Sequence, residues 1–232
     1  EVSDASGDLQ PISLMFRMSN VDTPSLLRFA QDNVESLAVG ESEYIRGNRS
    51  DKELVDLLVK QGEPSLFFKS EGPFLGDAIR RGDLAPTALI MIQPTSKARR
   101  EVCVNATRLG GNIDGTNTAA VSATVGTLME QVWKTSGFLQ KRLPGFEKAT
   151  FAGLAPRVGV RETRRIMGDY ILTKEDVVSG RKFPDSAIAK GAQHVDIHQS
   201  GTTQIRIPIA NGGSYDIPFG CLLPRGLKNV MV

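Results

Sequence analysis

The sequence predicts an α+β fold with a mixed, mainly antiparallel sheet and several helices. Segments of helical and of strand-like periodicity occur in groups and do not alternate regularly, which disfavours a doubly wound parallel sheet. The strand-like segments 87–93 and 100–108 are joined by a short polar loop that suits a hairpin. A chain of 232 residues with 40% hydrophobic side chains suits one large domain or two small ones, and we treat residues 1–232 as one domain.

The chain opens with a predicted strand and helix. Residues 12–18 alternate between two faces, with apolar side chains on one of them, which predicts a strand. Thr23 as N-cap and Pro24 at the first helical position then predict a helix that Gly40 can end.

Capping signals place the next helices. Ser50 and Glu53 have the spacing of a capping box and predict a helix that Gly62 ends. A short strand over 65–68 follows. The longest predicted helix covers 116–138, with one apolar stripe formed by Val121, Val125, Leu128, Met129 and Val132. The glycines before it match neither GxGxxG nor GxxxxGK[ST], which favours a plain loop over a phosphate-binding loop.

The second half of the chain predicts extended structure around one short helix. Residues 157–173 favour a strand, and Thr173 with Asp176 predicts a capped helix that Gly180 ends. Further short strands are predicted over 194–198, 202–210 and 221–232. Because the last of these ends within an apolar run, we expect the chain to be a fragment of a larger protein.

Charge and cysteine content disfavour several classes of function. A net charge of +2 and a pI of about 8.6 are too weak a bias to indicate nucleic acid or an anionic membrane as a partner. Cys103 and Cys221 lack CxxC spacing, so we expect free thiols. No apolar run reaches the roughly 18 residues of a membrane helix. The sequence contains no GxSxG elbow, which disfavours a serine hydrolase. It leaves the localisation open.

His194 and His198, the two histidines of the chain, flank Asp196. The apolar residues that alternate with them predict a strand, on which the two rings lie roughly 13 Å apart and cannot share one metal ion. We therefore expect no metal site. One histidine remains a candidate acid, base or hydrogen-bond donor, with a structural role as the alternative.

A cluster of charges follows the apolar residues at 158–160. On a strand, Arg161 and Arg165 would share one face with Thr163. Glu162 and Arg164 would share the other face and can pair there. Two hypotheses remain open: a structural ion-pair network, or a clamp in which the arginine fork holds an anionic cofactor or substrate.

Four segments carry a family resemblance. They are GDLQPISLMFRMSNVD (7–22), RLPGFEKA (142–149), GVRETRRIMGDYILTKEDVVSGRKFPDSAIAKGAQHVDIH (159–198) and YDIPFGCLLPRGLKNVMV (215–232). Together they resemble the signature of a family of FAD-dependent oxidoreductases. The stretch from about 33 to 100 adds nothing to the match.

The resemblance implies the middle, substrate-binding or cap domain of such an enzyme. In the family, FAD is bound by Rossmann-type segments with a GxGxxG turn, which this sequence lacks, and residues 215–232 would lead back toward them. We therefore expect FAD in the parent protein, no tight FAD binding by this chain alone, and activity only together with the missing FAD-binding domain or subunit. The implied reaction is hydride transfer between a small polar substrate and FAD.

Four residues are candidates for the site. Arg161 and Arg165 are candidate cofactor-binding residues, as anion or flavin-edge contacts. His198 is a candidate proton acceptor or donor, and Tyr215 a candidate hydrogen-bond donor in the pocket. The alternative hypothesis is a non-catalytic module that binds a ligand or partner without flavin.

Overall fold

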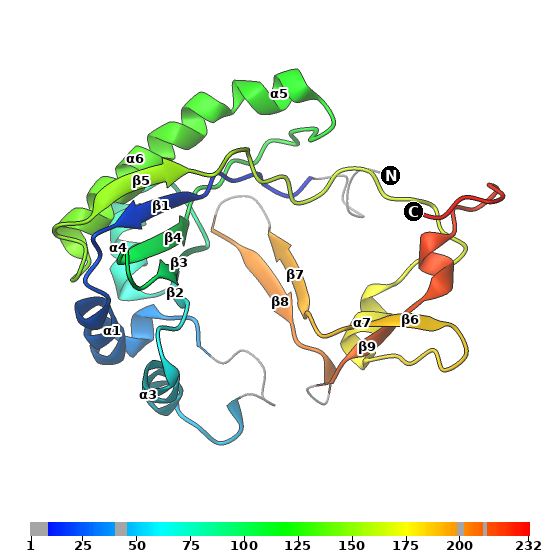
Figure 1. Cartoon of the computed structure of the whole chain (residues 1–232), viewed down its shortest axis with the longest axis horizontal. Coiled ribbons are helices and arrows are strands. Elements are labelled where there is room, and N and C mark those ends of the chain that lie inside the picture. Colours follow the sequence, from blue (N-terminus) through cyan, green and yellow to red (C-terminus); the bar gives the residue numbers. More distant parts are fainter. Residues whose placement is uncertain (1–8, 40–45, 199–201, 211–212) are drawn as a thin grey trace.

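The computed structural model describes residues 9–39, 46–198, 202–210 and 213–232 (Figure 1). Antiparallel sheets and several helices form a mixed α+β fold, which confirms the predicted class. The chain folds into a large part around a five-stranded sheet and a smaller part that contains two strand pairs.

The five-stranded sheet has the order β2-β3-β4-β1-β5, and each adjacent pair is antiparallel. Its strands are β1 (Phe16–Ser19), β2 (Leu66–Lys69), β3 (Leu89–Ser96), β4 (Glu101–Asn105) and β5 (Thr150–Leu154). The predicted alternation at the start of the chain is confirmed, because Ile12, Leu14, Phe16 and Met18 are all buried in the main core. The short loop between β3 and β4 closes the expected hairpin. The β5 strand had no clear sequence signal.

Helices cover this sheet (Figure 1). They are α1 (Thr23–Asp32), α3 (Asp51–Gln61), α4 (Pro73–Arg80), α5 (Thr118–Ala123) and α6 (Val125–Arg142), with the 3-10 helix η1 (Val34–Ser36). The capping box of Ser50 and Glu53 is confirmed. The first helix ends earlier than predicted, at Asp32, and its N-cap is Asp22 instead of Thr23. Gly40, its expected end, lies outside the described residues.

The long helix predicted over 116–138 is interrupted. It is divided at Thr124, whose hydroxyl donates to the Val121 carbonyl at 2.6 Å and so competes for a helical acceptor. Leu128 and Val132 of the predicted stripe are fully buried against the sheet. Among the described residues, no helix has the length and apolar character needed to cross a membrane.

The smaller part is built from two antiparallel strand pairs and one helix. Strands β6 (Ala187–Gly191) and β9 (Tyr215–Pro218) pair, as do β7 (Val195–His198) and β8 (Gln204–Ile207). The α7 helix (Lys174–Ser179) and the 3-10 helix η3 (Phe219–Leu222) complete this part. The β7–β8 hairpin lies between the large sheet and the β6–β9 pair (Figure 1).

Two predicted strands are wrong. Residues 160–167 belong to no strand, and the segment lies between the bridges of Gly159 to Ser13 and Gly168 to Pro224. Within it, Arg161 and Glu162 bond to the backbone of Pro11 and Gln10. An apolar pattern alone does not create a strand where no neighbouring strand is available to pair along its length. Residues 227–232 likewise form no strand, and their apolar side chains are exposed.

Candidate functional site

A small polar cavity lies where the β7–β8 hairpin meets the end of β4. We call it the hairpin cavity; its volume is about 20 Å³, room for roughly one water molecule. It is lined by Thr87, Ala88, Leu89, Asn105, Ala106, Thr107, Arg108, Arg161, His198 and Gln204. Two of the four candidate residues from the sequence, Arg161 and His198, therefore meet at one site.

The register of the hairpin gathers four polar side chains. His198 is opposite Gln204, and Asp196 is opposite Arg206. Since both pairs are separated by two positions along their strands, all four side chains lie on one face of the hairpin. These four side chains form a polar cluster, and two of them, His198 and Gln204, also line the hairpin cavity.

Asp196 is held as a carboxylate by this cluster. The Gln204 Nε2 donates to its Oδ1 at 2.6 Å, and the His198 Nε2 lies 3.6 Å from its Oδ2. Burial alone would raise the pKa of Asp196, but the contacts with His198 and Gln204 and the charges of His198 and Arg206 lower it to about 2. The Asp196 carboxylate therefore stays ionised beside the His198 ring.

The position of His198 is also fixed from outside the hairpin. The His198 backbone N–H donates to the Gln10 Oε1 at 3.0 Å. Within the hairpin, the Gln204 Nε2 lies 3.4 Å from the His198 Nε2. Gln10 lies near the start of the described chain, so this contact joins the hairpin to the large part of the molecule.

Two arginine side chains, buried Arg108 and partly buried Arg161, lie on the wall of the hairpin cavity. Arg161 donates to the Pro11 carbonyl, and burial lowers its pKa, an effect partly offset by Asp196. Arg108 is 8% exposed and donates to the Thr203 carbonyl at 2.9 Å. Burial and the charge of Arg161 lower the pKa of Arg108 to about 10, again partly offset by Asp196. Two residues of like charge therefore line one small cavity.

The backbone of Arg108 is fixed by α6. The Gln131 side chain accepts from the Arg108 N–H at 2.8 Å and donates to its carbonyl at 3.0 Å. These two bonds fix the backbone of Arg108, just beyond the end of β4, and so fix the point from which its side chain extends.

Arg165 lies apart from this wall. Its side chain is 49% exposed, and its Nη2 pairs at 2.5 Å with Oε2 of Glu162, whose side chain is 7% exposed. Glu162 also accepts from the Gln10 N–H at 2.6 Å. The predicted pairing of Glu162 with Arg164 is therefore wrong. Because the segment is not a regular strand, alternation does not decide which of its charges meet.

Tyr215 lies on a different strand pair from His198. It is opposite Gly191 on β6, and a methyl group added at Gly191 would come within 2.3 Å of the Tyr215 ring. The tyrosine ring thus covers the backbone of β6. No contact between Tyr215 and the hairpin cavity is present among the described residues, and its role as a donor stays a prediction.

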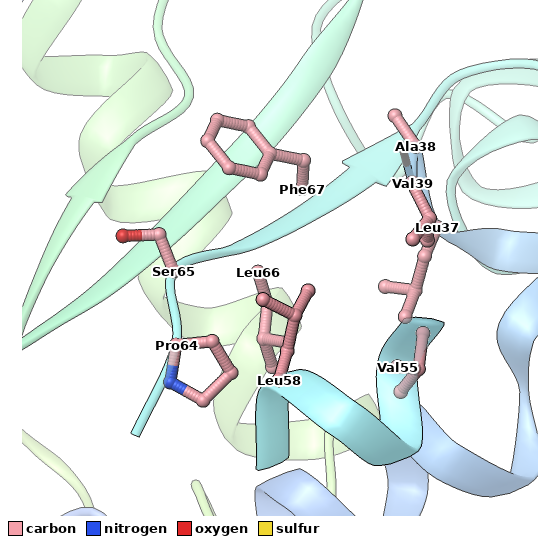
Figure 2. Close-up of a pocket in the computed structure, with 9 residues that line it drawn as sticks. All are labelled: Leu37, Ala38, Val39, Val55, Leu58, Pro64, Ser65, Leu66 and Phe67. Atoms are coloured by element: carbon pink, nitrogen blue, oxygen red, sulfur yellow. The ribbon is translucent and has the colours of Figure 1, made fainter. Parts of the chain in front are cut away.

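A larger pocket is apolar. It has a volume of about 410 Å³ and lies between α3, β2 and the residues after η1 (Figure 2). Its wall is formed by Leu37, Ala38, Val39, Val55, Leu58, Pro64, Ser65, Leu66 and Phe67. No side chain in this wall is ionisable, so the pocket supplies no acid, base or charged anchor.

Asp196, Gln204 and Arg108 were missed as site residues from sequence. Asp196 had a signal, because it lies two positions before His198 on a predicted strand and must share its face. Arg108 had none, since its burial depends on the hairpin that folds over it from 95 positions later. Within the described ranges, no group of three or more His, Cys, Asp or Glu side chains can hold a metal ion.

The fold and site define an α+β domain with a charged internal cavity between its two parts. The chain belongs to the FAD dependent oxidoreductase family, whose family model matches residues 1–232. No curated protein and no solved structure matches the chain significantly. Membership of this family gives the chain a flavin-dependent oxidoreductase context.

Neither the sequence motifs nor the described sheets match a Rossmann-type FAD dinucleotide site. The sequence has no GxGxxG turn, and every strand pair of the described sheets is antiparallel. A Rossmann-type site needs a parallel βαβ unit with the pyrophosphate at the helix N-terminus. The glycine-containing loop before α5 leads into a helix of 6 residues.

Proposed function

We propose that the chain is the substrate-binding portion of a flavin-dependent oxidoreductase that transfers hydride between a small polar substrate and FAD. The observation that carries the proposal is the meeting of His198 and Arg161 at one cavity in a chain of the FAD dependent oxidoreductase family. These residues lie at opposite ends of the resembling segment 159–198, so their proximity is a property of the fold.

His198 is the proposed proton acceptor. Removal of a hydride from an alcohol or amine carbon must be accompanied by loss of a proton from the attached oxygen or nitrogen, and a positioned imidazole can take it. The adjacent Asp196 stabilises the resulting imidazolium, and Gln204 holds that carboxylate in place. In the reverse direction the same imidazolium donates the proton.

Of the remaining candidates, Arg161 lines the hairpin cavity, while Arg165 and Tyr215 are not among its lining residues. Arg161 orients an anionic group on the cavity wall, and Arg165, which is half-exposed, is available to a flavin edge or phosphate. Tyr215 is proposed to donate a hydrogen bond to the substrate. FAD, whose chemistry when bound is hydride acceptance, is held by an FAD-binding domain or subunit outside this chain. Neither nucleic acid nor a membrane is a proposed partner.

The first experiment is a titration of the purified chain with FAD, followed by flavin fluorescence. We expect no tight binding, because no segment of the chain fits the dinucleotide. Stoichiometric, tight binding of FAD by these 232 residues would show that the cofactor site is internal and that no separate FAD-binding domain is needed.

The second experiment uses the protein that joins this chain to its FAD-binding domain. Hydroxy acids, sugars and amines are mixed with it anaerobically, and loss of the oxidised flavin absorbance reports hydride transfer. For a substrate that reduces the flavin, His198→Gln should slow reduction by about 10²–10⁴-fold at unchanged FAD content. Arg157→Gln, at an exposed position, is the control. Reduction at the wild-type rate in His198→Gln contradicts the role of His198, and a natural protein without flavin supports the non-catalytic alternative.

A further inference from the structure

We propose that the large apolar pocket beside α3 is a binding site for an uncharged, apolar small molecule. We call it the α3–β2 pocket, and its wall consists of the nine residues labelled in Figure 2. None of these residues lines the hairpin cavity, so the inference goes beyond the proposed function and does not depend on hydride transfer.

Two walls of the α3–β2 pocket meet at the edge of the large sheet. The residues after η1 lie along β2, because the Ala38 N–H donates to the Phe67 carbonyl at 2.7 Å and Leu37 forms a β-bridge with Phe68. Backbone contacts therefore fix the position of residues 37–39 relative to β2.

The third wall is one face of α3. The opposite face is attached to α1, since the Lys52 Nζ donates to the Gln31 carbonyl and the Gln31 Nε2 donates to the Asp56 Oδ1, both at 2.8 Å. Successive helical residues are about 100° apart, so Val55 and Leu58 share a face and Leu58 lies nearly opposite Asp56. Polar contacts thus anchor α3 to α1, and its apolar face forms the wall of the pocket.

The chemistry of the wall favours an uncharged ligand. Eight of its nine side chains are apolar, and the remaining one is Ser65. A charged group that moves from water into this wall would lose hydration and gain no ion pair. The ligand that fits is therefore hydrocarbon in character and carries no charge.

Leu58 leaves apolar surface in the wall that a ligand can cover. Its exposed fraction is 41%, whereas Val55 on the same helix face is 3% exposed. A ligand in the pocket would remove this leucine surface from water, which is a favourable contribution to binding. Leu57 is exposed to a similar extent, 36%, but does not belong to the wall, so it supplies a matched control.

The size of the pocket favours a small molecule over a protein partner. Its volume of about 410 Å³ lies within the range of about 300–1,000 Å³ that is typical of small-molecule sites. A standard protein interface uses about 20–30 residues on each side. The nine residues of this wall are far fewer.

The test uses the purified chain without flavin and three probes with the same alkyl chain. At pH 7, 1-octanol is uncharged, octanoate is an anion and octylammonium is a cation. Each is titrated below the concentration at which it aggregates, and binding is followed by calorimetry and by methyl chemical shifts. We expect octanol to bind and to shift the methyl groups of Val55 and Leu58. The charged probes should bind at least about 10-fold more weakly.

Variants locate the site. Leu58→Gln places an amide in the wall and should weaken octanol binding by about 10-fold or more. Leu57→Gln makes the same change at the neighbouring position outside the wall and should leave binding unchanged. Ala38→Leu adds apolar volume to the wall and should also weaken binding. It serves as the test if Leu58→Gln does not fold, which the melting temperature will show.

Several results would overturn the proposed site. They are no saturable octanol binding, equal binding of octanol and either charged probe, an equal loss in Leu57→Gln and Leu58→Gln, and unchanged binding in both Leu58→Gln and Ala38→Leu. A wild-type dimer that becomes a monomer in Leu58→Gln, measured by sedimentation, would show that a second copy of the chain covers the pocket. Because no step involves flavin, failure here leaves the proposed function intact, and failure of hydride transfer leaves this site intact.

Discussion

The Tyr170 hydroxyl donates a 2.7 Å hydrogen bond to the Asp176 Oδ2, which links the segment after the arginine cluster to the first turn of α7. Asp176 is buried and also accepts from the Thr173 N–H at 3.0 Å and from the Arg181 Nη1 at 2.9 Å. Arg181 in turn stacks over the Phe183 ring, 4.8 Å from its centroid. One carboxylate therefore joins both ends of α7 to the segment before it.

Asp176→Asn should destabilise the protein at neutral pH, because the amide cannot accept all of these bonds and places a donor toward Tyr170 or Arg181. We expect the free energy of unfolding to fall by about 1–3 kcal/mol, measured by urea denaturation at pH 7. Glu175→Gln, which changes an exposed carboxylate in the same turn, is the control.

The destabilisation caused by Asp176→Asn should depend on pH. Burial alone would raise the pKa of Asp176, but bonds from Thr173, Tyr170 and Arg181 lower it to about 2, from 3.8 in an unperturbed aspartate. A lowered folded-state pKa gives stability that is present above the unfolded value and is lost as the pH falls through the folded value. The stability difference between wild type and Asp176→Asn should shrink between about pH 4 and pH 2; a constant difference would contradict the ionised role.

The Glu162–Arg165 pair allows a direct test of which arginine Glu162 meets. A double-mutant cycle with Glu162→Gln and Arg165→Gln should give a coupling of about 0.2–1 kcal/mol, because Arg165 is half-exposed and solvent weakens the pair. The matched cycle with Arg164→Gln should give no coupling. Measured by urea denaturation, a larger coupling to Arg164 would restore the pairing expected from sequence.

Local signals predicted the elements, while long-range contacts decided the site. The capping box of Thr173 and Asp176 was correct because four consecutive residues contain all of its groups. The charge pairing was wrong because Glu162 is held by Gln10, 152 positions earlier. Arg161 and His198 were singled out by residue type, and their roles stay predictions. That they line one cavity depends on where the β7–β8 hairpin docks, which no local pattern contains.

Gln204→Leu should change the titration of Asp196. The variant removes the 2.6 Å bond from the amide to the Asp196 carboxylate and leaves a shorter, apolar side chain. Because that bond is one of the contacts that lower the pKa to about 2, the pKa of Asp196 should rise in the variant. Carboxyl-carbon NMR titration measures it directly, with Gln93→Leu on the exposed side of β3 as the control. An unchanged midpoint would show that the charges of His198 and Arg206 suffice.

The close approach of Tyr215 to Gly191 predicts a strict size limit at that glycine. In Gly191→Ala the new methyl group would lie within 2.3 Å of the ring, so the ring must move or the β6–β9 register must shift, at a cost of about 1–3 kcal/mol in unfolding free energy. Gly137→Ala in α6 meets no atom within 4 Å and should stabilise by about 0.5–1 kcal/mol, since alanine favours helix.

The double variant Gly191→Ala with Tyr215→Ala should recover part of the loss from Gly191→Ala, because the obstructing ring is gone. If it recovers nothing, the ring does not limit this position. If Tyr215→Ala alone is as stable as wild type, the ring is not needed to hold β6 on β9, and Tyr215 can be tested as a substrate contact without a folding defect.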